Sequence, residues 1–321
     1  MNFTWQKSLW QDLVRLYSAE KVPHAILLAG PRHSGLETLA GSYMKLLMCT
    51  NPQNDMPCGN CRSCTLYESG THPDGFQLGV LEDKKEIVID QVRQLIHQLS
   101  LSSIAAGRKV ALICPAEAMN RNSQNAVLKT LEEPVGSAVI ILVTNDPGHL
   151  LPTIRSRCRM FSQPLPGKKV GLEWLADNHP GADEKSREAA WGAAGGLPLL
   201  ALKYLEDGTL EQRRAVAKIL FQLARSGGNS LQAAQSFKDF PKPDVWLWIS
   251  GWMAALARTL LGGEEPDDKM VEAFRNTLPR LTAKKALELQ AQALRSYQMH
   301  DGPVREDLLL ADWLIQWQSS R

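Results

Sequence analysis

Cysteine residues are concentrated in one short segment, "CTNPQNDMPCGNCRSC", which places Cys49, Cys58, Cys61 and Cys64 in a C-x8-C-x2-C-x2-C array. Gaps of two residues allow successive thiolates to turn toward one point. Four thiolates fill the tetrahedral shell of a structural Zn²⁺ and leave no open position for catalysis. The spacing therefore predicts a structural zinc site with these cysteines as its ligands.

Two alternatives apply to this cluster. Cys49 has to reach back from the end of a predicted helix, and His72 is the substitute ligand if it does not. The other alternative is a chance group of free cysteines. The remaining two cysteines, Cys114 and Cys158, lie in apolar or strand-like stretches and are expected in the core.

A second candidate site is the stretch "GPRHSGLET", residues 30–38, which has the glycine spacing of a phosphate-binding loop. Such a loop cradles phosphates with backbone N–H groups, neutralises them with a lysine and holds Mg²⁺ with a Ser or Thr hydroxyl. Leu36 and Glu37 stand where those side chains are required. The sequence predicts a degenerate phosphate loop made of Gly30, Gly35, Leu36 and Glu37, with a plain strand-to-helix turn as the alternative.

The second half of an ATP site is also missing. An Asp, usually followed by Glu, should end a later strand and organise Mg²⁺ and water. In "KVALICPAEAMN" those places hold Cys114 and Pro115. Two independent losses predict that no ATP is bound productively.

These candidate sites lie on an alternating pattern of short apolar runs and amphipathic stretches that ends near Pro166. The predicted strands are 24–30, 74–80, 109–114 and 138–144, and the predicted helices are 35–49, 88–101 and 122–134. Strands that alternate with helices imply parallel βαβ units and a sheet buried on both faces. The pattern predicts an α/β fold for this half.

After the linker "QPLPGKK", residues 163–169, strand signals nearly vanish and Leu, Ala and Trp recur at helical spacing. A second break is expected near "EDGTL", residues 206–210. The second half is therefore predicted to be helical and to divide into a small unit and a larger bundle.

Charge and hydropathy limit the function. Over 321 residues, 36 Lys and Arg stand against 34 Asp and Glu, a formal charge of +2. So small a charge does not hold nucleic acid by counterion release, and any DNA contact has to be local or shared with partners. The start "MNFTWQKSLW" has no apolar signal core, and runs such as "AVIILV" are too short to span a bilayer. We expect a cytoplasmic protein with no membrane contact.

The run "KVALICPAEAMNRNSQNAVLKTLEEP", followed by "ILVTNDP" and "TIRSRC", resembles the AAA+ subunits of the bacterial DNA polymerase III clamp loader. The cysteine module after the phosphate-loop helix is similar too. The resemblance covers about residues 20–165 with specific motifs and extends more weakly beyond them. It implies a zinc-bearing AAA+ α/β domain over 1–165 with the zinc module at 49–64, a small helical lid over 166–207, and a helical collar for oligomerisation over 208–321.

The sequence departs from the active members of that family. The ATP-hydrolysing gamma/tau subunits keep the loop lysine and the acidic pair, and this sequence lacks both. Active subunits also place a nucleotide-contacting arginine in the lid, where "AAGGLPLLAL" has Pro198 and Leu199. The resemblance therefore implies a subunit with no intrinsic activity, working as a component of the DNA-directed DNA polymerase holoenzyme, a nucleotidyltransferase.

One catalytic element of the family is retained. In "TIRSRC", Ser156, Arg157 and Cys158 match the motif with which clamp-loader subunits project an arginine into the neighbouring ATP site. A guanidinium supplied in trans neutralises charge on the γ-phosphate. The resemblance implies that Arg157 is an arginine finger. The alternative is a solvated basic face at a helix end, shared with Arg155 and Arg159.

The implied role is the fixed arm of a hetero-pentamer with delta and gamma/tau subunits, which holds the complex open at delta and helps to load the sliding clamp on primed DNA. One rival is an active gamma/tau-type ATPase, opposed by Leu36 and Cys114. A rival of another class is a zinc-dependent nucleic-acid-binding module on a vestigial nucleotide fold. The near-neutral charge and the closed cysteine site oppose it.

Overall fold

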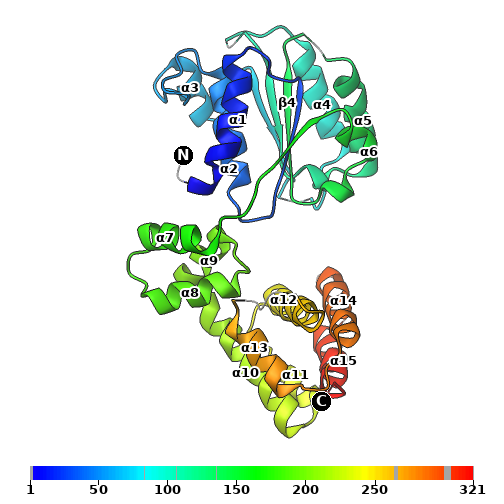
Figure 1. Cartoon of the computed structure of the whole chain (residues 1–321). Coiled ribbons are helices and arrows are strands. Elements are labelled where there is room, and N and C mark those ends of the chain that lie inside the picture. The colour runs from blue at the N-terminus through cyan, green and yellow to red at the C-terminus, as the bar shows by residue number, and fades with distance from the viewer. Residues whose placement is uncertain are drawn as a thin grey trace. The chain divides into compact units, whose positions relative to one another are not determined.

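The computed structural model describes residues 3–82, 84–105, 107–134, 136–263, 267–299 and 305–320. The chain divides into two compact units, residues 1–166 and residues 167–321 (Figure 1). The first unit is α/β and the second is helical, as the sequence predicts.

The first unit is built on a five-stranded sheet with the strand order β2-β3-β4-β1-β5, in which every paired strand is parallel. The strands are β1 (Ala25–Ala29), β2 (Gly75–Leu78), β3 (Val110–Ile113), β4 (Val139–Thr144) and β5 (Arg159–Ser162). The three central strands are buried at every residue, which explains their continuous apolar sequences. The edge strands β2 and β5 are partly exposed.

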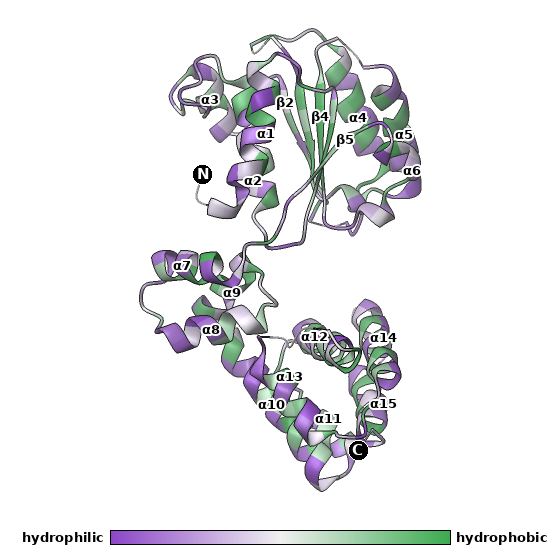
Figure 2. Ribbon diagram, in the orientation of Figure 1, coloured by the Kyte–Doolittle hydropathy of each residue, from purple (hydrophilic) through white to green (hydrophobic). Residues whose placement is uncertain are grey.

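Helices cover both faces of this sheet. One face packs on α1 (Lys7–Ser18) and α2 (Leu36–Met48), and the other on α4 (Ile89–Ser100), α5 (Arg121–Glu132) and α6 (Pro152–Arg155). Successive strand residues alternate between the two cores. On β1, Ile26 and Leu28 join the first core, while Ala25 and Leu27 join the second. The strands accordingly appear as a mainly hydrophobic layer between the helices (Figure 2).

Short elements complete the first unit. They are α3 (Arg62–Glu68) and the 3-10 helices η1 (Thr4–Gln6), η2 (Ala116–Ala118) and η3 (Pro147–His149). Helices α1, α3 and α6 and strand β5 were not among the elements that the sequence pattern predicted. The helices and strands that were predicted all form, with ends that differ by one or two residues.

The second unit contains only helices among its described residues. They are α7 (Lys168–Asn178), α8 (Glu184–Ala193), α9 (Pro198–Glu206), α10 (Thr209–Ser226), α11 (Ser230–Gln235), α12 (Lys242–Leu260), α13 (Lys269–Thr277), α14 (Ala283–Met299) and α15 (Glu306–Gln318). The core of α10 to α15 is rich in fully buried tryptophan, as expected for helix packing: Trp246, Trp252, Trp313 and Trp317. The break between α9 and α10 lies at Gly208, which has a positive φ of 71°.

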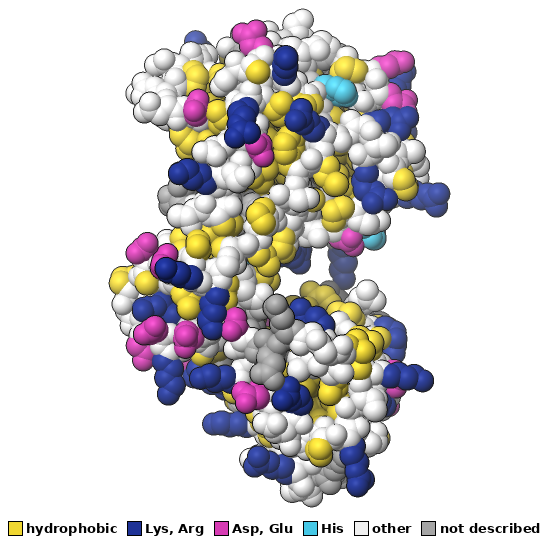
Figure 3. Space-filling model, in the orientation of Figure 1, with side chains coloured by type: hydrophobic (Ala, Val, Ile, Leu, Met, Phe, Trp, Pro, Cys, Tyr) yellow, Lys and Arg dark blue, Asp and Glu magenta, His cyan; other side chains and the backbone are white. Residues whose placement is uncertain are grey.

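In the part of the chain that the structure describes, we find no helix with both the length and the apolar character needed to cross a membrane. Acidic and basic side chains are interspersed around α7, α8 and α9 on the face drawn in Figure 3. That mixture agrees with the small net charge of the sequence.

Candidate functional site

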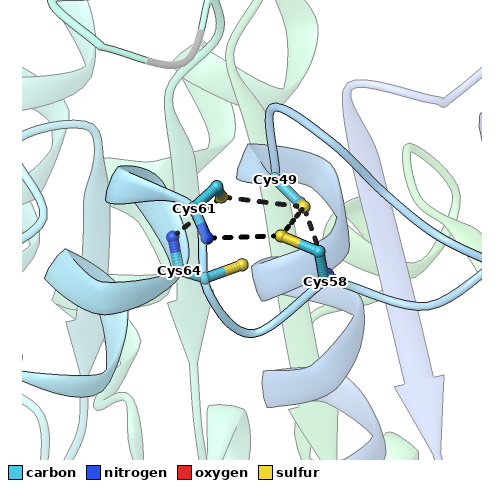
Figure 4. A group of neighbouring side chains, drawn as sticks. All are labelled: Cys49, Cys58, Cys61 and Cys64. Carbon is cyan, nitrogen blue, oxygen red and sulfur yellow. Dashed lines mark hydrogen bonds between the residues drawn. The ribbon is translucent and has the colours of Figure 1, made fainter.

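The four cysteines of the predicted zinc site converge on one point (Figure 4). Cys49 caps the C-terminus of α2, and Cys61 caps the N-terminus of α3. The sulfur of Cys49 lies 3.6 Å from that of Cys58 and 3.9 Å from that of Cys61, and all four sulfurs lie within 4.8 Å of one another. Four sulfurs at a Zn–S distance of about 2.3 Å are separated by about 3.8 Å. The cluster therefore has the dimensions of a single zinc site.

Backbone amides support the sulfurs. The N–H of Cys58 donates to the sulfur of Cys49 at 3.4 Å, that of Cys61 to Cys58 at 3.3 Å, and that of Cys64 to Cys61 at 3.4 Å. Burial opposes the Cys61 thiolate, but hydrogen bonds from Thr50 and from the Cys64 amide outweigh it and lower the pKa of Cys61 to about 5. Burial raises the pKa of Cys64 to about 12. Four thiolates here require a cation, and this donor set suits Zn²⁺.

His72, the alternative to Cys49, does not join the cluster. Its Nδ1 accepts a hydrogen bond from the amide of Asp74 at 3.1 Å, so Nε2 carries the proton and donates to the hydroxyl of Ser63, 2.6 Å away. Both side chains are buried, and burial lowers the pKa of His72. The histidine thus ties α3 to the chain leading into β2, while the cluster itself contains Cys49.

The degenerate phosphate loop joins β1 to α2, and its interior is filled by the protein itself. Gly35 has a φ of +81°, and Leu36 is only 2% exposed. A Cβ added to Gly30 would lie 3.3 Å from a methyl group of Leu36, and one added to Gly35 would lie 2.5 Å from the ring of Phe3. Glu37 is exposed.

The Ser34 carbonyl of the same loop accepts hydrogen bonds from residues near the beginning and near the end of the α/β unit. The Ser34 carbonyl accepts hydrogen bonds from Trp5 Nε1 at 2.9 Å and from Gln163 Nε2 at 2.8 Å. Gln6 Nε2 donates to the Gln163 side chain at 2.8 Å. These contacts hold the N-terminal segment and the end of β5 against the loop.

The position of the missing acidic pair is occupied by a thiol. Burial, and then the carboxylates of Glu37 and Glu117, raise the pKa of Cys114 to about 12. At the end of β4, Asn145 donates its side-chain N–H to Glu117 at 3.0 Å, and the Thr144 hydroxyl accepts from the amide of Asp146 at 3.1 Å. The polar groups at these strand ends are therefore satisfied within the protein.

The arginine motif forms the turn between α6 and β5. Arg157 Nη1 donates to the Thr153 carbonyl at 3.0 Å, and Nη2 pairs with Glu132 Oε1 at 2.7 Å, with the arginine side chain 35% exposed. Arg155 ends α6, whereas Arg159 begins β5 and lies 5.4 Å from the centre of the Phe161 ring. The three arginines thus occupy three different environments.

The sequence analysis did not single out Gln124, which holds this segment in place. The side chain is 4% exposed; Nε2 donates to the Met119 carbonyl at 3.0 Å, and Oε1 accepts from the amide of Leu151 at 2.8 Å. Its signal in the sequence is a polar residue on the buried face of the amphipathic helix α5.

Comparison with known proteins identifies the family. A family profile described as DNA polymerase III, delta subunit, matches residues 5–165. DNA polymerase III subunit delta-prime of Pseudomonas aeruginosa is 36% identical over 99% of this chain and 97% of its own length. The chain belongs to the delta-prime family of DNA polymerase III clamp-loader subunits. The delta-prime subunit of Escherichia coli is 30% identical over 76% of this chain and 73% of its own.

More distant similarity reaches other polymerase III subunits. The tau/gamma subunit of Haemophilus influenzae is 33% identical over 44% of this chain and 20% of its own length. A gamma subunit-related protein from Thermotoga maritima covers 97% of this chain and 99% of its own at 18% identity and a TM-score of 0.45. The resemblance inferred from the motifs is confirmed at the level of the family, and the first unit has the parallel α/β sheet that the sequence predicts.

Proposed function

We propose that this chain is the clamp-loader subunit without ATPase activity that presents Arg157 to the ATP site of an adjacent gamma/tau subunit. One contrast carries the proposal. Leu36, at the position of the phosphate-binding lysine, is buried at 2% exposure, whereas the Arg157 side chain is 35% exposed on a braced turn.

Three features support the lack of nucleotide chemistry. Leu36 brings no charge to a phosphate, and the exposed carboxylate of Glu37 repels a polyanion. Cys114 with a raised pKa is a neutral thiol at neutral pH and a poor ligand for Mg²⁺, which prefers oxygen. Because Leu36 is buried in the loop and no lysine stands at its position, the loop lacks the positive charge that would neutralise the phosphates of Mg-ATP.

The role of Arg157 follows from the chemistry of its side chain. A guanidinium is planar, stays charged and matches two phosphate oxygens at once. Supplied in trans, it stabilises the charge that develops on the transferred phosphoryl group, an effect of about 10³–10⁵ in rate. The chain would thereby control hydrolysis of a nucleotide that it does not itself hold.

The cysteine cluster is proposed to hold one structural Zn²⁺ through Cys49, Cys58, Cys61 and Cys64. The ion supplies cross-linking and no reaction chemistry, because four protein ligands close its shell. Since Cys49 caps the C-terminus of α2 and Cys61 caps the N-terminus of α3, the site would fasten the loop between the two helices.

The wider role rests on family membership. We propose a hetero-pentamer with delta and gamma/tau subunits, which this chain holds open at delta while the complex loads the sliding clamp on primed DNA in the cytoplasm. The proposed domains are the AAA+ domain over 1–165, a lid over 166–207 and a collar over 208–321.

The test is Arg157→Ala in the reassembled complex. The variant should fold and assemble, since a part-exposed arginine contributes little to the core. DNA- and clamp-stimulated ATPase should fall in part, and clamp loading should fall further. Arg155→Ala and Arg159→Ala are the matched controls. Equal behaviour of all three variants would favour a merely solvated basic face, and wild-type loading by the Arg157→Ala complex would overturn the proposal.

A further inference from the structure

The guanidinium of Arg157 is braced by two oxygen atoms from two different elements. The Thr153 carbonyl of α6 lies 3.0 Å from Nη1, and Glu132, the last residue of α5, lies 2.7 Å from Nη2. The hydroxyl of Ser156 is more distant, 3.5 Å from Nη1. The position of the charged group is therefore set jointly by α5 and α6.

The ion pair with Glu132 is a poor candidate for a stabilising contact. The two side chains are 35% and 48% exposed, and ion pairs so open to water contribute little to the stability of a fold. Helix α6 already has a separate, partly buried attachment to α5 through the hydrogen bond from the amide of Leu151 to Gln124. Glu132 instead restricts the conformation of the Arg157 side chain.

An unrestrained arginine populates many rotamers, and fixing it against a phosphate costs conformational entropy. A carboxylate that already selects one rotamer removes part of that cost before the phosphate arrives. A guanidinium has five N–H donors, so the two short contacts leave three for phosphate oxygens. Glu132 can therefore hold Arg157 without blocking it.

We infer that Glu132 is a positioning residue for Arg157: its carboxylate fixes the guanidinium at the α5–α6 junction, aimed for the ATP site of the neighbouring subunit. This inference rests on the proposed function of Arg157. It goes beyond that function because it assigns a second residue, 25 positions earlier in the chain, to the same catalytic step in trans.

The chain provides a matched control beside the residue itself. Glu132 and Glu133 are both exposed, and within the described part of the chain only Glu132 pairs with Arg157. The experiment compares Glu132→Gln, Glu132→Asp, Glu133→Gln and Arg157→Ala, each in the fully reassembled clamp loader. Assembly is checked by gel filtration, and ATP hydrolysis is measured with DNA and clamp present.

For the one site that this chain adjoins, Glu132→Gln should lower kcat about three- to tenfold, a loss within the range of couplings between contacting residues. KM for ATP should be unchanged, because the arginine acts on charge that develops in the transition state. Glu132→Asp should recover part of the rate, and Glu133→Gln should match the wild type. Glu132→Gln combined with Arg157→Ala should be no slower than Arg157→Ala alone.

The outcomes separate this inference from the proposal beneath it. A slow Arg157→Ala complex with a wild-type or accelerated Glu132→Gln complex overturns the positioning role and leaves the arginine finger standing. The positioning role is also overturned if Glu132→Gln lowers the rate of the Arg157→Ala complex by the same factor as it lowers the rate of the wild-type complex. Glu132 would then act independently of the arginine. A wild-type Arg157→Ala complex overturns both.

Discussion

Two loops of the α/β unit have sequences patterned to hold a ligand, and they differ in what fills them. In the loop between α2 and α3, four cysteine sulfurs lie within 4.8 Å of one another, with backbone amides pointing at them. In the loop between β1 and α2, Leu36 packs on Gly30, Phe3 covers Gly35 and the Ser34 carbonyl is capped by side chains. The cysteine loop thus gathers four sulfur ligands around one point, whereas the phosphate loop is filled and covered by side chains of the protein itself.

The two loops show which structural features separate a motif that can bind a ligand from one that keeps only its spacing. Glycine spacing survives in the phosphate loop because the strand-to-helix turn still needs it, as the φ of +81° at Gly35 shows. Leu36, which stands at the position of the phosphate-binding lysine, is buried and packs on Gly30 instead. Cysteine spacing, by contrast, has no structural use without an ion, so the convergence of the four sulfurs supports the proposed zinc site.

The largest expected effect is loss of the ion from the cysteine loop. Cys61→Ser should abolish binding of about one zinc per chain, which contributes on the order of 10 kcal/mol to ordering such a segment. Metal analysis and hydrogen exchange should show zinc lost and residues 49–68 unprotected, with the sheet intact.

Cys114→Ser is the matched control for that experiment, because Cys114 lies outside the cluster. It should keep its zinc. A wild-type protein that is free of metal yet fully protected over the cysteine loop would refute the zinc assignment and remove the contrast between the two loops.

The next effect concerns the phosphate loop. Leu36→Lys restores the missing lysine but places a charge at a site that is 2% exposed, so the free energy of unfolding should fall by about 2–4 kcal/mol. ATPase activity should stay absent, because Cys114 and Pro115 still replace the acidic pair. Urea unfolding and an ATPase assay of the purified variant check both parts.

Glu37→Ser, at the adjacent exposed position, should change stability by less than about 0.5 kcal/mol. If Leu36→Lys were as stable as the wild type and bound ATP, the phosphate loop would be open rather than closed, and the two loops would not differ in this way.

The smallest effect compares one glycine from each loop. Gly35 and Gly59 have nearly the same φ, +81° and +77°, but a Cβ on Gly35 meets Phe3 at 2.5 Å while one on Gly59 meets nothing within 4 Å. Alanine at either place should cost about 1 kcal/mol for its backbone conformation. Gly35→Ala should cost about 1–2 kcal/mol more in urea unfolding, because Phe3 has to move. Equal losses would show that Phe3 does not seal the loop.

Much of this architecture was predictable from local pattern. Strands β1, β3 and β4 are continuous apolar runs because both faces of the sheet are covered, and the cysteine spacing alone identified the cluster. Strand β5 was missed, since its sequence Arg159–Ser162 lies at the sheet edge and is largely exposed, which removes the apolar signal.

Contacts between residues far apart in the chain could not be predicted from the sequence. The hydrogen bond of Gln6 with Gln163 spans 157 positions, and the pairing of Glu132 with Arg157 depends on how α5 and α6 pack. The exclusion of His72 from the cluster depends on its partner Ser63, which no spacing rule identifies. Such contacts follow from the tertiary fold and carry no local periodicity.

A pre-steady-state burst of ATP hydrolysis can show whether this chain contributes an arginine, and no nucleotide of its own, to the complex. With DNA and clamp present, the reassembled complex carrying Arg157→Ala should lose the burst amplitude of one ATP site. The remaining sites should hydrolyse ATP at wild-type rates. Arg157→Lys should restore little of that amplitude, because lysine keeps the charge but lacks the planar fork. An Arg157→Ala complex with the full wild-type amplitude and rate would show that Arg157 does not act on a neighbouring ATP site.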